Sequence, residues 1–341
     1  MRWVVAQPGP SFSVHDTYVG WVEALRNAGQ HVVEFNLDDR LTLFGSALKQ
    51  IGEGAFARML TAEQSYDLAV DGLNSTLYKA RPDVLLVVSG FFIPPQLLDR
   101  ARRSGTRIVL LHTEQPYEQD RQLKLAPFAD INLVDDMTGI ENFQAVAPTA
   151  YCPKAYRPTV HCPGPVLPGL ASDLAFVGTG YQSRVDFFEA MDLSGLDVLL
   201  AGNWGQLTED SRLYPFVAHD PEECLPNERT VDVYRSARVG LNLYRREAQR
   251  PELSAGWSMG PREVEMAAIG LPFARDPRGE GDDVLPMLPT FQDPAEAAEI
   301  VRWFLTHDEE REKASLAIRE AVADRTFDHM AAVLLRLLDV A

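Results

Sequence analysis

Short apolar runs that alternate with helical patterns are the feature that most constrains how this chain folds. Val84–Val88 is a continuous apolar run, which is typical of a strand buried on both faces of a sheet. Alternation of such runs with helix-length segments indicates parallel βα units. The sequence predicts strands at 3–6, 31–37, 83–89, 107–112 and 131–134 in a first set, and at 174–177, 198–201, 239–243 and 271–274 in a second.

A segment rich in proline and glycine separates the two sets. Residues 151–169 contain five prolines and two glycines, a composition suited to an interdomain connection. A chain of 341 residues with 46% hydrophobic content can bury two cores. We therefore expect an α/β protein with a domain at 1–155, a linker at 156–172 and a second domain at 173–325. Two doubly wound sheets that face each other would place ligands in a cleft at their carboxyl ends.

Composition excludes several classes of function. The formal charge of −17 repels phosphate backbones, which disfavours nucleic acid as a partner. Three cysteines lack metal-ligand spacing and the histidines form no HExxH pair, so we expect no metal. The N-terminus lacks the pattern of a signal peptide, and no apolar stretch is long enough to span a bilayer. These features predict a cytoplasmic protein.

Residues 258–272 carry the clearest functional motif. Pro261 suits the first position of a helix and Gly270 the residue just past its end, which predicts a helix of about nine residues. Gly260 and Arg262 then lie beside N–H groups that have no intrahelical partner, an arrangement that favours a phosphate. Glu265 follows one turn later on the same face and offers an acceptor for a ribose hydroxyl. The alternative is an exposed helix ion pair.

A glycine-bearing loop follows the strand at 174–177. Gly178 and Thr179 precede a predicted helix that contains Arg184, so backbone N–H groups and a cation would approach a phosphate there. No third glycine completes a dinucleotide fingerprint, because position 183 is serine. A tight βα turn is the alternative interpretation.

Two further strand ends carry candidate donor-binding residues. Asn203 and Trp204 follow the strand at 198–201 and offer an amide and an aromatic face to a base or sugar. Trp204 can equally pack in the core beside a glycine turn. Asn242 ends the strand at 239–243, where its side chain serves either the cleft or a local turn.

The first half offers candidates for base catalysis. Loop 7–16 follows the first strand and contains Gly9, His15 and Asp16, so it is expected to approach the donor and to supply a group that takes a proton from an acceptor hydroxyl. Capping of a helix that begins at Thr17 is the stronger interpretation of Asp16. Glu114 follows the strand at 107–112 as a second base candidate, and acidic loop residues are usually solvated.

Three of these segments together resemble a known family. The loop Phe176–Arg184, the strand Ala237–Leu243 and the segment Pro261–Pro272 resemble the catalytic domain of GT-B glycosyltransferases, especially the CgeB-like branch of group 1. The resemblance covers roughly residues 173–340. It implies two Rossmann-like domains, with a C-terminal helix at 326–341 that returns to the first domain.

The resemblance also implies roles for individual residues. Arg262 would contact the donor diphosphate, Glu265 the ribose, and the 178–184 loop would approach the donor. Many retaining members carry a glutamate eight residues before the one that matches Glu265, and here that position is Trp257. Retention or inversion of the anomeric centre is therefore left open.

The function implied is transfer of a sugar from a nucleoside-diphosphate sugar to a hydroxyl group, without a cofactor or metal. The acceptor is a protein, a glycan, a small molecule or a modified nucleic acid. Two alternatives remain. One is a nucleotide-sugar epimerase or hydrolase on the same fold, and the other is a non-catalytic carbohydrate-binding or coat protein on a GT-B scaffold.

Overall fold

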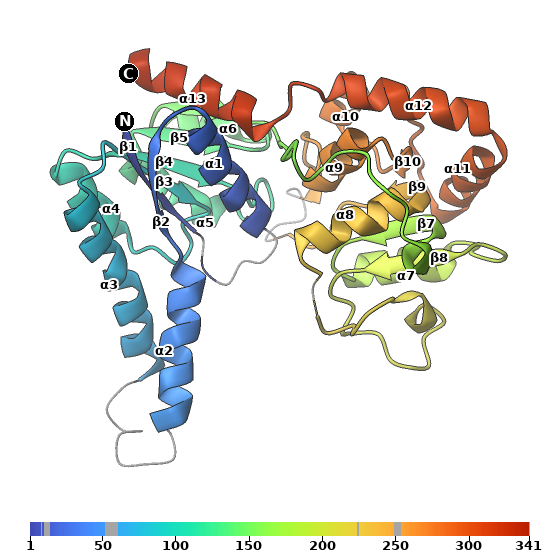
Figure 1. The fold of residues 1–341 in the computed structure, drawn as a ribbon, viewed down its shortest axis with the longest axis horizontal. Helices are drawn as coiled ribbons and strands as arrows, with labels where there is room; N and C mark the ends of the chain where they lie inside the picture. Colours follow the sequence, from blue (N-terminus) through green and yellow to red (C-terminus); the bar gives the residue numbers. More distant parts are fainter. Residues whose placement is uncertain (8, 10–13, 52–60, 224, 249–253, 341) are drawn as a thin grey trace. The chain divides into compact units, whose positions relative to one another are not determined.

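The computed structural model describes residues 1–7, 9, 14–51, 61–223, 225–248 and 254–340 (Figure 1). The chain divides into two compact units. The N-terminal unit comprises Met1–Cys152 and Phe327–Ala341, and the C-terminal unit comprises Pro153–Thr326. The last helix therefore belongs to the same unit as the first strand.

The N-terminal unit is built on a six-stranded parallel sheet with the order β2-β1-β3-β4-β5-β6. Its central strand β3 carries the apolar run at 84–88, and all five of its residues are fully buried. The strands are β1 (Arg2–Ala6), β2 (His31–Phe35), β3 (Val84–Val88), β4 (Arg107–His112), β5 (Ile131–Val134) and β6 (Thr149–Tyr151). The helices are α1 (His15–Asn27), α2 (Leu37–Ile51), α3 (Ala62–Ala80), α4 (Pro95–Arg103), α5 (Gln119–Leu123), α6 (Ile140–Gln144) and α13 (Phe327–Val340).

The C-terminal unit holds a four-stranded parallel sheet with the order β10-β9-β7-β8. Its strand order reverses between β7 and β9, and doubly wound sheets bind ligands at such a switch point. The strands are β7 (Ser172–Val177), β8 (Val198–Ala201), β9 (Ala237–Asn242) and β10 (Phe273–Arg275). The helices are α7 (Gln182–Ala190), α8 (Asn227–Ser236), α9 (Pro261–Ile269), α10 (Gly279–Val284), α11 (Pro294–Thr306) and α12 (Asp308–Ala321).

The two parallel sheets confirm the α/β fold class, and the differences from the sequence prediction have local causes. The strand predicted at 271–274 lies at Phe273–Arg275, because the αL residue Gly270 and the turn after it separate α9 from β10. Strand β6 was not predicted, and no bounds were predicted for the helices between β2 and β3, which are α2 and α3. Helix α3 begins with a capping box between Thr61 and Gln64, and α2 and α3 run side by side away from the sheet (Figure 1).

Helix α13 packs against α1 within the N-terminal unit. The Trp21 and Phe327 rings meet edge to face with centroids 6.3 Å apart. Arg107 Nη1 donates to the Leu338 carbonyl at 2.6 Å, and Asn27 Nδ2 donates to Asp328 Oδ1 at 3.0 Å. The position of α13 is thus fixed by aromatic packing and by hydrogen bonds at both ends.

Gly20→Ala is expected to loosen this contact. A Cβ at Gly20 would overlap the Phe327 ring, and overpacking of this kind costs about 1–3 kcal/mol. Denaturant unfolding measures the loss. Gly169→Ala is the control because a Cβ there meets no atom within 4 Å; equal stabilities of the two variants would contradict the packing.

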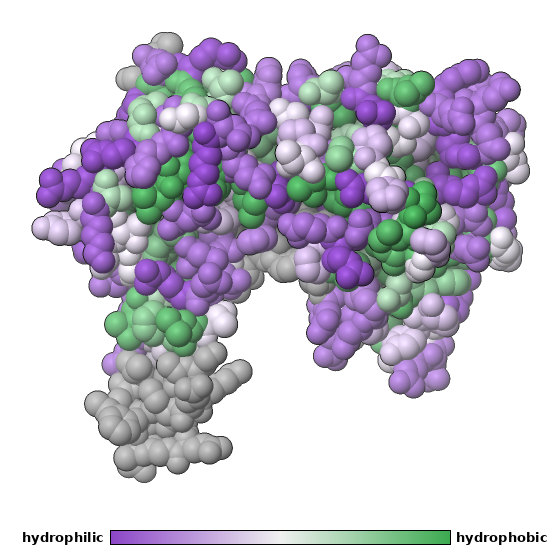
Figure 2. Space-filling model, viewed as in Figure 1, coloured by the Kyte–Doolittle hydropathy of each residue, from purple (hydrophilic) through white to green (hydrophobic). Residues whose placement is uncertain are grey.

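The surface seen in Figure 2 is mainly hydrophilic, with hydrophobic side chains in scattered groups. Large apolar residues of the described chain lie mostly in the two cores. None of the described helices combines the length and the apolar character needed to cross a membrane.

Candidate functional site

The loops after β7 and β8 approach each other closely at the carboxyl edge of the C-terminal sheet. The Gly178 N–H donates to the Ala201 carbonyl at 2.8 Å. Gly202 has φ 111°, and a Cβ there would overlap the Gly178 carbonyl. Glycine is therefore required at 202 for both conformational and steric reasons. The predicted loop at Gly178 and Thr179 lies at the strand-order switch.

Arg184, in the first turn of α7, joins two of these loops. Its Nη1 donates to the Thr179 carbonyl at 2.9 Å and its Nη2 to the Leu243 carbonyl at 2.6 Å. The guanidinium also lies 5.3 Å from the centroid of the Phe176 ring. Arg184 thus holds the β7 loop against the end of β9, and its predicted contact with the donor stays a prediction.

The structure decides between the two interpretations of Trp204. Its side chain is fully buried, with ring centroids 6.0 Å from both Phe176 and Phe188. The interpretation as an aromatic face for a ligand is wrong, because the indole fills the core of the unit. Asn203 builds the adjoining turn, since its Oδ1 accepts from the Gly205 N–H at 3.1 Å.

Asn242 is the last residue of β9 and is buried. Its carbonyl accepts from the Asp276 N–H at 3.1 Å. Its Nδ2 has no hydrogen-bond partner within the described part of the chain, which is unusual for a buried amide.

Helix α9 spans the nine residues that the sequence predicted. Gly260 is its N-cap, Pro261 its first residue, and Gly270 ends it with φ 88°. The Gly270 N–H donates to the Met266 carbonyl at 3.0 Å, and the Leu271 N–H to the same carbonyl at 2.9 Å. These bonds satisfy the last turn and fix the end of the helix.

Arg262 and Glu265 form an ion pair on α9, with Nη1 2.6 Å from Oε2. The side chains are 25% and 6% exposed, so the pair is largely buried and not the exposed pair considered above. A buried carboxylate requires a partner. Arg262 therefore has a structural task in addition to the contact predicted with the donor.

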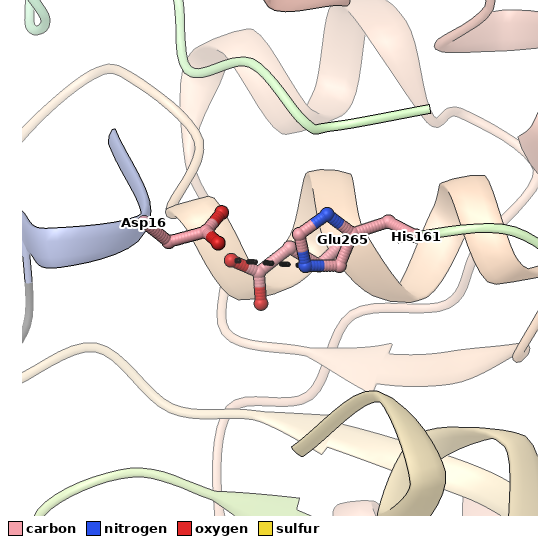
Figure 3. A group of neighbouring side chains, drawn as sticks. All are labelled: Asp16, His161 and Glu265. Carbon is pink, nitrogen blue, oxygen red and sulfur yellow. Dashed lines mark ion pairs between the residues drawn. The ribbon is translucent and has the colours of Figure 1, made fainter. Parts of the chain in front are cut away.

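His161 is a neighbour of Glu265 that sequence reasoning missed. Its Nδ1 accepts from the Arg157 N–H at 3.2 Å, and its Nε2 lies 4.0 Å from Glu265 Oε1 (Figure 3). Because Nδ1 is an acceptor, the proton of the neutral ring sits on Nε2 and faces the carboxylate. Asp16, also drawn in Figure 3, belongs to helix α1 of the N-terminal unit.

Glu263 is a second missed residue and is fully buried behind the first turn of α9. Its Oε2 accepts from the Gly260 N–H at 2.7 Å and from the Tyr244 hydroxyl. Burial raises the pKa of Glu263 to about 7, against the effect of these hydrogen bonds. Burial and the neighbouring carboxylate raise the pKa of Tyr244 well above its usual range, so the phenol stays a donor.

Arginine side chains lie near this buried pair and beside it. The Arg278 guanidinium lies 4.1 Å from the centroid of the Tyr244 ring. Arg246 Nη2 bonds to both carboxylate oxygens of the buried Asp276, at 2.7 and 2.8 Å. Cations and carboxylates therefore alternate at the carboxyl ends of β9 and β10.

Trp257, the residue at the position of the missing glutamate, lies against α10. A Cβ at Gly279 would overlap its indole ring, and its carbonyl accepts from the Glu280 N–H at 2.9 Å.

The base candidates lie in the N-terminal unit. Helix α1 begins at His15, with Val14 as its N-cap, so Asp16 lies inside the first turn and its interpretation as an N-cap is wrong. An acidic residue there still interacts favourably with the helix dipole. His15 Nδ1 lies 3.1 Å from Gln7 Nε2. Glu114 follows β4, where its carbonyl accepts from the Glu118 N–H at 2.9 Å.

Gly9 follows β1 and lies beside the Phe92 ring. The rest of the predicted loop, residues 8 and 10–13, falls outside the described residues. Roles for Gly9, His15, Asp16 and Glu114 in the reaction stay predictions.

One family model matches most of the C-terminal unit together with part of α13. Residues 184–336 match the family model described as "Glycosyl transferase-like". This segment includes Arg184, Asn203, Asn242, Gly260, Arg262 and Glu265. No curated protein sequence matches the chain.

Solved structures extend the likeness to the whole chain. Sucrose-phosphate synthase from Thermosynechococcus elongatus is 13% identical with a TM-score of 0.65, over 99% of this chain and 98% of that chain. The E. coli trehalose-6-phosphate structure bound with UDP-2-fluoro glucose is 12% identical with a TM-score of 0.64, over 99% of each chain. A putative UDP-N-acetylglucosamine 2-epimerase from Listeria monocytogenes is 13% identical with a TM-score of 0.60, over 99% of this chain and 95% of that chain. At such identities the likeness establishes the fold, which is GT-B.

Proposed function

We propose that this chain, which has the GT-B fold and matches a glycosyl transferase-like family model over residues 184–336, transfers a sugar from a nucleoside-diphosphate sugar to an acceptor hydroxyl. The observation that carries the proposal is the N-terminus of α9, where Arg262 and Glu265 share one helix face. A helix N-terminus favours anionic groups through its N–H donors and its dipole. The donor diphosphate is the anion that this arrangement suits.

Arg262 and the dipole of α9 would act as the leaving diphosphate gains charge. A fixed guanidinium and oriented N–H groups stabilise that charge without reorganisation of solvent. Metal ions supply the same stabilisation in other enzymes, so our proposal does not require one. Glu265 would accept a ribose hydroxyl, as its family resemblance implies, while its other oxygen faces His161.

The acceptor hydroxyl must lose a proton as it attacks the anomeric carbon. His15, Asp16 and Glu114 of the N-terminal unit are our candidates for the base.

A nucleotide-sugar epimerase is a second candidate, because a putative epimerase is among the similar structures. A binding protein without catalysis is a third, because Trp257 occupies the position of a glutamate found in many retaining members. All three would bind the same donor, so their products distinguish them.

Product analysis tests the proposal. UDP-, ADP-, GDP- and dTDP-linked sugars are incubated with the protein and with a panel of glycan, peptide and small-alcohol acceptors. Transfer predicts release of the nucleoside diphosphate that increases when one acceptor is present. An altered sugar with the nucleotide still attached would instead show an epimerase, and binding without any turnover would show the scaffold.

A further inference from the structure

Glu263 lies on the inner side of α9, next to the helix end at which the donor diphosphate is proposed to bind. It is the third residue of the helix, and its Oε2 is 2.7 Å from the N–H of the N-cap residue Gly260. Pro261 has no N–H. The buried carboxylate therefore already holds one of the few N–H donors at this helix end, and it places a second anion next to the phosphate site.

The groups around Glu263 allow it to exist in both charge states. Tyr244, which follows β9, donates to its Oε2. Arg275 at the end of β10 and Arg278 before α10 favour the ionised form by their charge. A Cβ at Gly281 would lie 2.7 Å from Arg275 Nη1 and 3.7 Å from Glu263 Oε1, so the absence of a side chain at Gly281 lets cation and carboxylate share this space.

The neighbouring acid Glu280 does not take part in the same way. Its Oε2 accepts from the Met259 N–H at 2.7 Å, and its Oε1 from Arg325 Nη1 at 2.8 Å. In contrast, Glu263 Oε1 has no hydrogen-bond partner among the described residues. A buried carboxylate oxygen without a partner makes the ionised form of Glu263 unfavourable, and a proton bound at this oxygen neutralises the carboxylate.

We propose that Glu263 is a positioning residue that takes up a proton when the donor diphosphate binds at the N-terminus of α9. The proposal rests on the proposed donor site. Glu263 acts through the helix and does not touch the donor: its charge sets how strongly the N-terminus attracts a second anion. The proton binds to Glu263 Oε1, and no bond other than this O–H is made or broken.

The direction of the pH dependence follows from the pKa of Glu263. In the free protein that pKa is about 7, and a nearby diphosphate raises it further because like charges oppose ionisation. The complex therefore holds more protons than the free protein above neutral pH. By linkage, donor affinity is constant at acidic pH and falls by up to about tenfold per pH unit above pH 7.

Isothermal titration of UDP-glucose tests this, since the phosphates of a sugar nucleotide are diesters that do not titrate near neutral pH. ADP-, GDP- and dTDP-glucose are titrated in parallel. Titrations at about pH 6 and pH 8, in two buffers of different ionisation enthalpy, count the protons taken up. At about pH 8 the wild type is expected to take up a proton on binding and to bind more weakly than at about pH 6.

Glu263→Gln is the decisive variant, because an amide keeps the shape and an acceptor oxygen but cannot ionise. It is expected to show no proton uptake, and at pH 8 to bind about tenfold more tightly than the wild type. A purely structural role would instead weaken binding at every pH. Glu296→Gln is the matched control, because Glu296 lies in the first turn of α11 and also accepts a backbone N–H near the start of its helix, from Gln292 at 2.8 Å.

The outcomes separate the two proposals. A wild-type pH dependence that persists unchanged in Glu263→Gln would overturn the role of Glu263 and leave the donor site intact. Failure of all four sugar nucleotides to bind to the folded protein would overturn the donor site, and the role of Glu263 with it.

Discussion

Arg262→Ala is expected to weaken sugar-nucleotide binding by about tenfold to a hundredfold, because hydrogen bonds to charged groups contribute about 1.5–3 kcal/mol each. The loss arises at the start of α9, where the guanidinium is 25% exposed and lies 2.6 Å from Glu265. Titration calorimetry with the sugar nucleotide that binds the wild type measures the change. Arg262→Lys, which keeps the charge but loses the planar fork, is expected to bind with intermediate affinity.

The substitution also leaves the buried Glu265 carboxylate without its cation, so thermal unfolding of each variant must be recorded beside its affinity. Arg302→Ala is the matched control. Arg302 lies on another helix, α11, and forms an exposed ion pair with Asp192 at 3.1 Å. Undiminished affinity in a folded Arg262→Ala protein would remove Arg262 from the donor site.

Trp204→Ala is expected to lower the free energy of unfolding by about 3–5 kcal/mol, as is usual when a buried tryptophan is truncated. The indole is fully buried and makes edge contacts with Phe176 and Phe188, and its Nε1 donates to the Ala201 carbonyl at 3.3 Å. Chemical denaturation that reports on unfolding of the C-terminal unit measures the loss in the free energy of unfolding.

Trp303→Ala provides the comparison, because the Trp303 side chain is 43% exposed. Its removal is expected to cost much less than that of Trp204. If Trp204→Ala retained full stability and lost ligand binding instead, the indole would be a ligand platform and its assignment to the core would fail.

Local signals account for the parts of the fold that the sequence predicts well. Strand β3 consists of five consecutive apolar residues, and α9 is bounded by Pro261 and Gly270. Both patterns arise from backbone chemistry within a few residues. Helices α2 and α3 lie between β2 and β3, where alternation predicts helical structure, but their bounds were not predicted; the two helices pack mainly on each other.

In the candidate site, too, contacts within one helix are predictable from the sequence, whereas contacts between separate segments are not. Arg262 and Glu265 are one helical turn apart, so spacing alone predicts their pairing. His161 meets Glu265, and Tyr244 meets Glu263, across long stretches of chain and through loops whose conformation spacing does not fix. The pKa of Glu263 depends on this packing, because burial is its largest cause.

Arg184 shows a different limit of prediction. A cation after a glycine-bearing loop suggests a phosphate contact, but the structure bonds the guanidinium to the carbonyls of Thr179 and Leu243. Sequence can identify a cation near a strand end, whereas its partners depend on which loops the sheet brings together.

Amide hydrogen exchange with and without a bound sugar nucleotide is the measurement that tests the central claim most directly. Ligand contacts slow exchange at the amides they cover. The donor site proposed here predicts slower exchange in peptides that contain Gly260, Arg262 and Glu263, and no such change in Arg262→Ala at the same ligand concentration. Binding that slows exchange elsewhere in the C-terminal unit and leaves these amides unchanged would contradict a donor site at the N-terminus of α9.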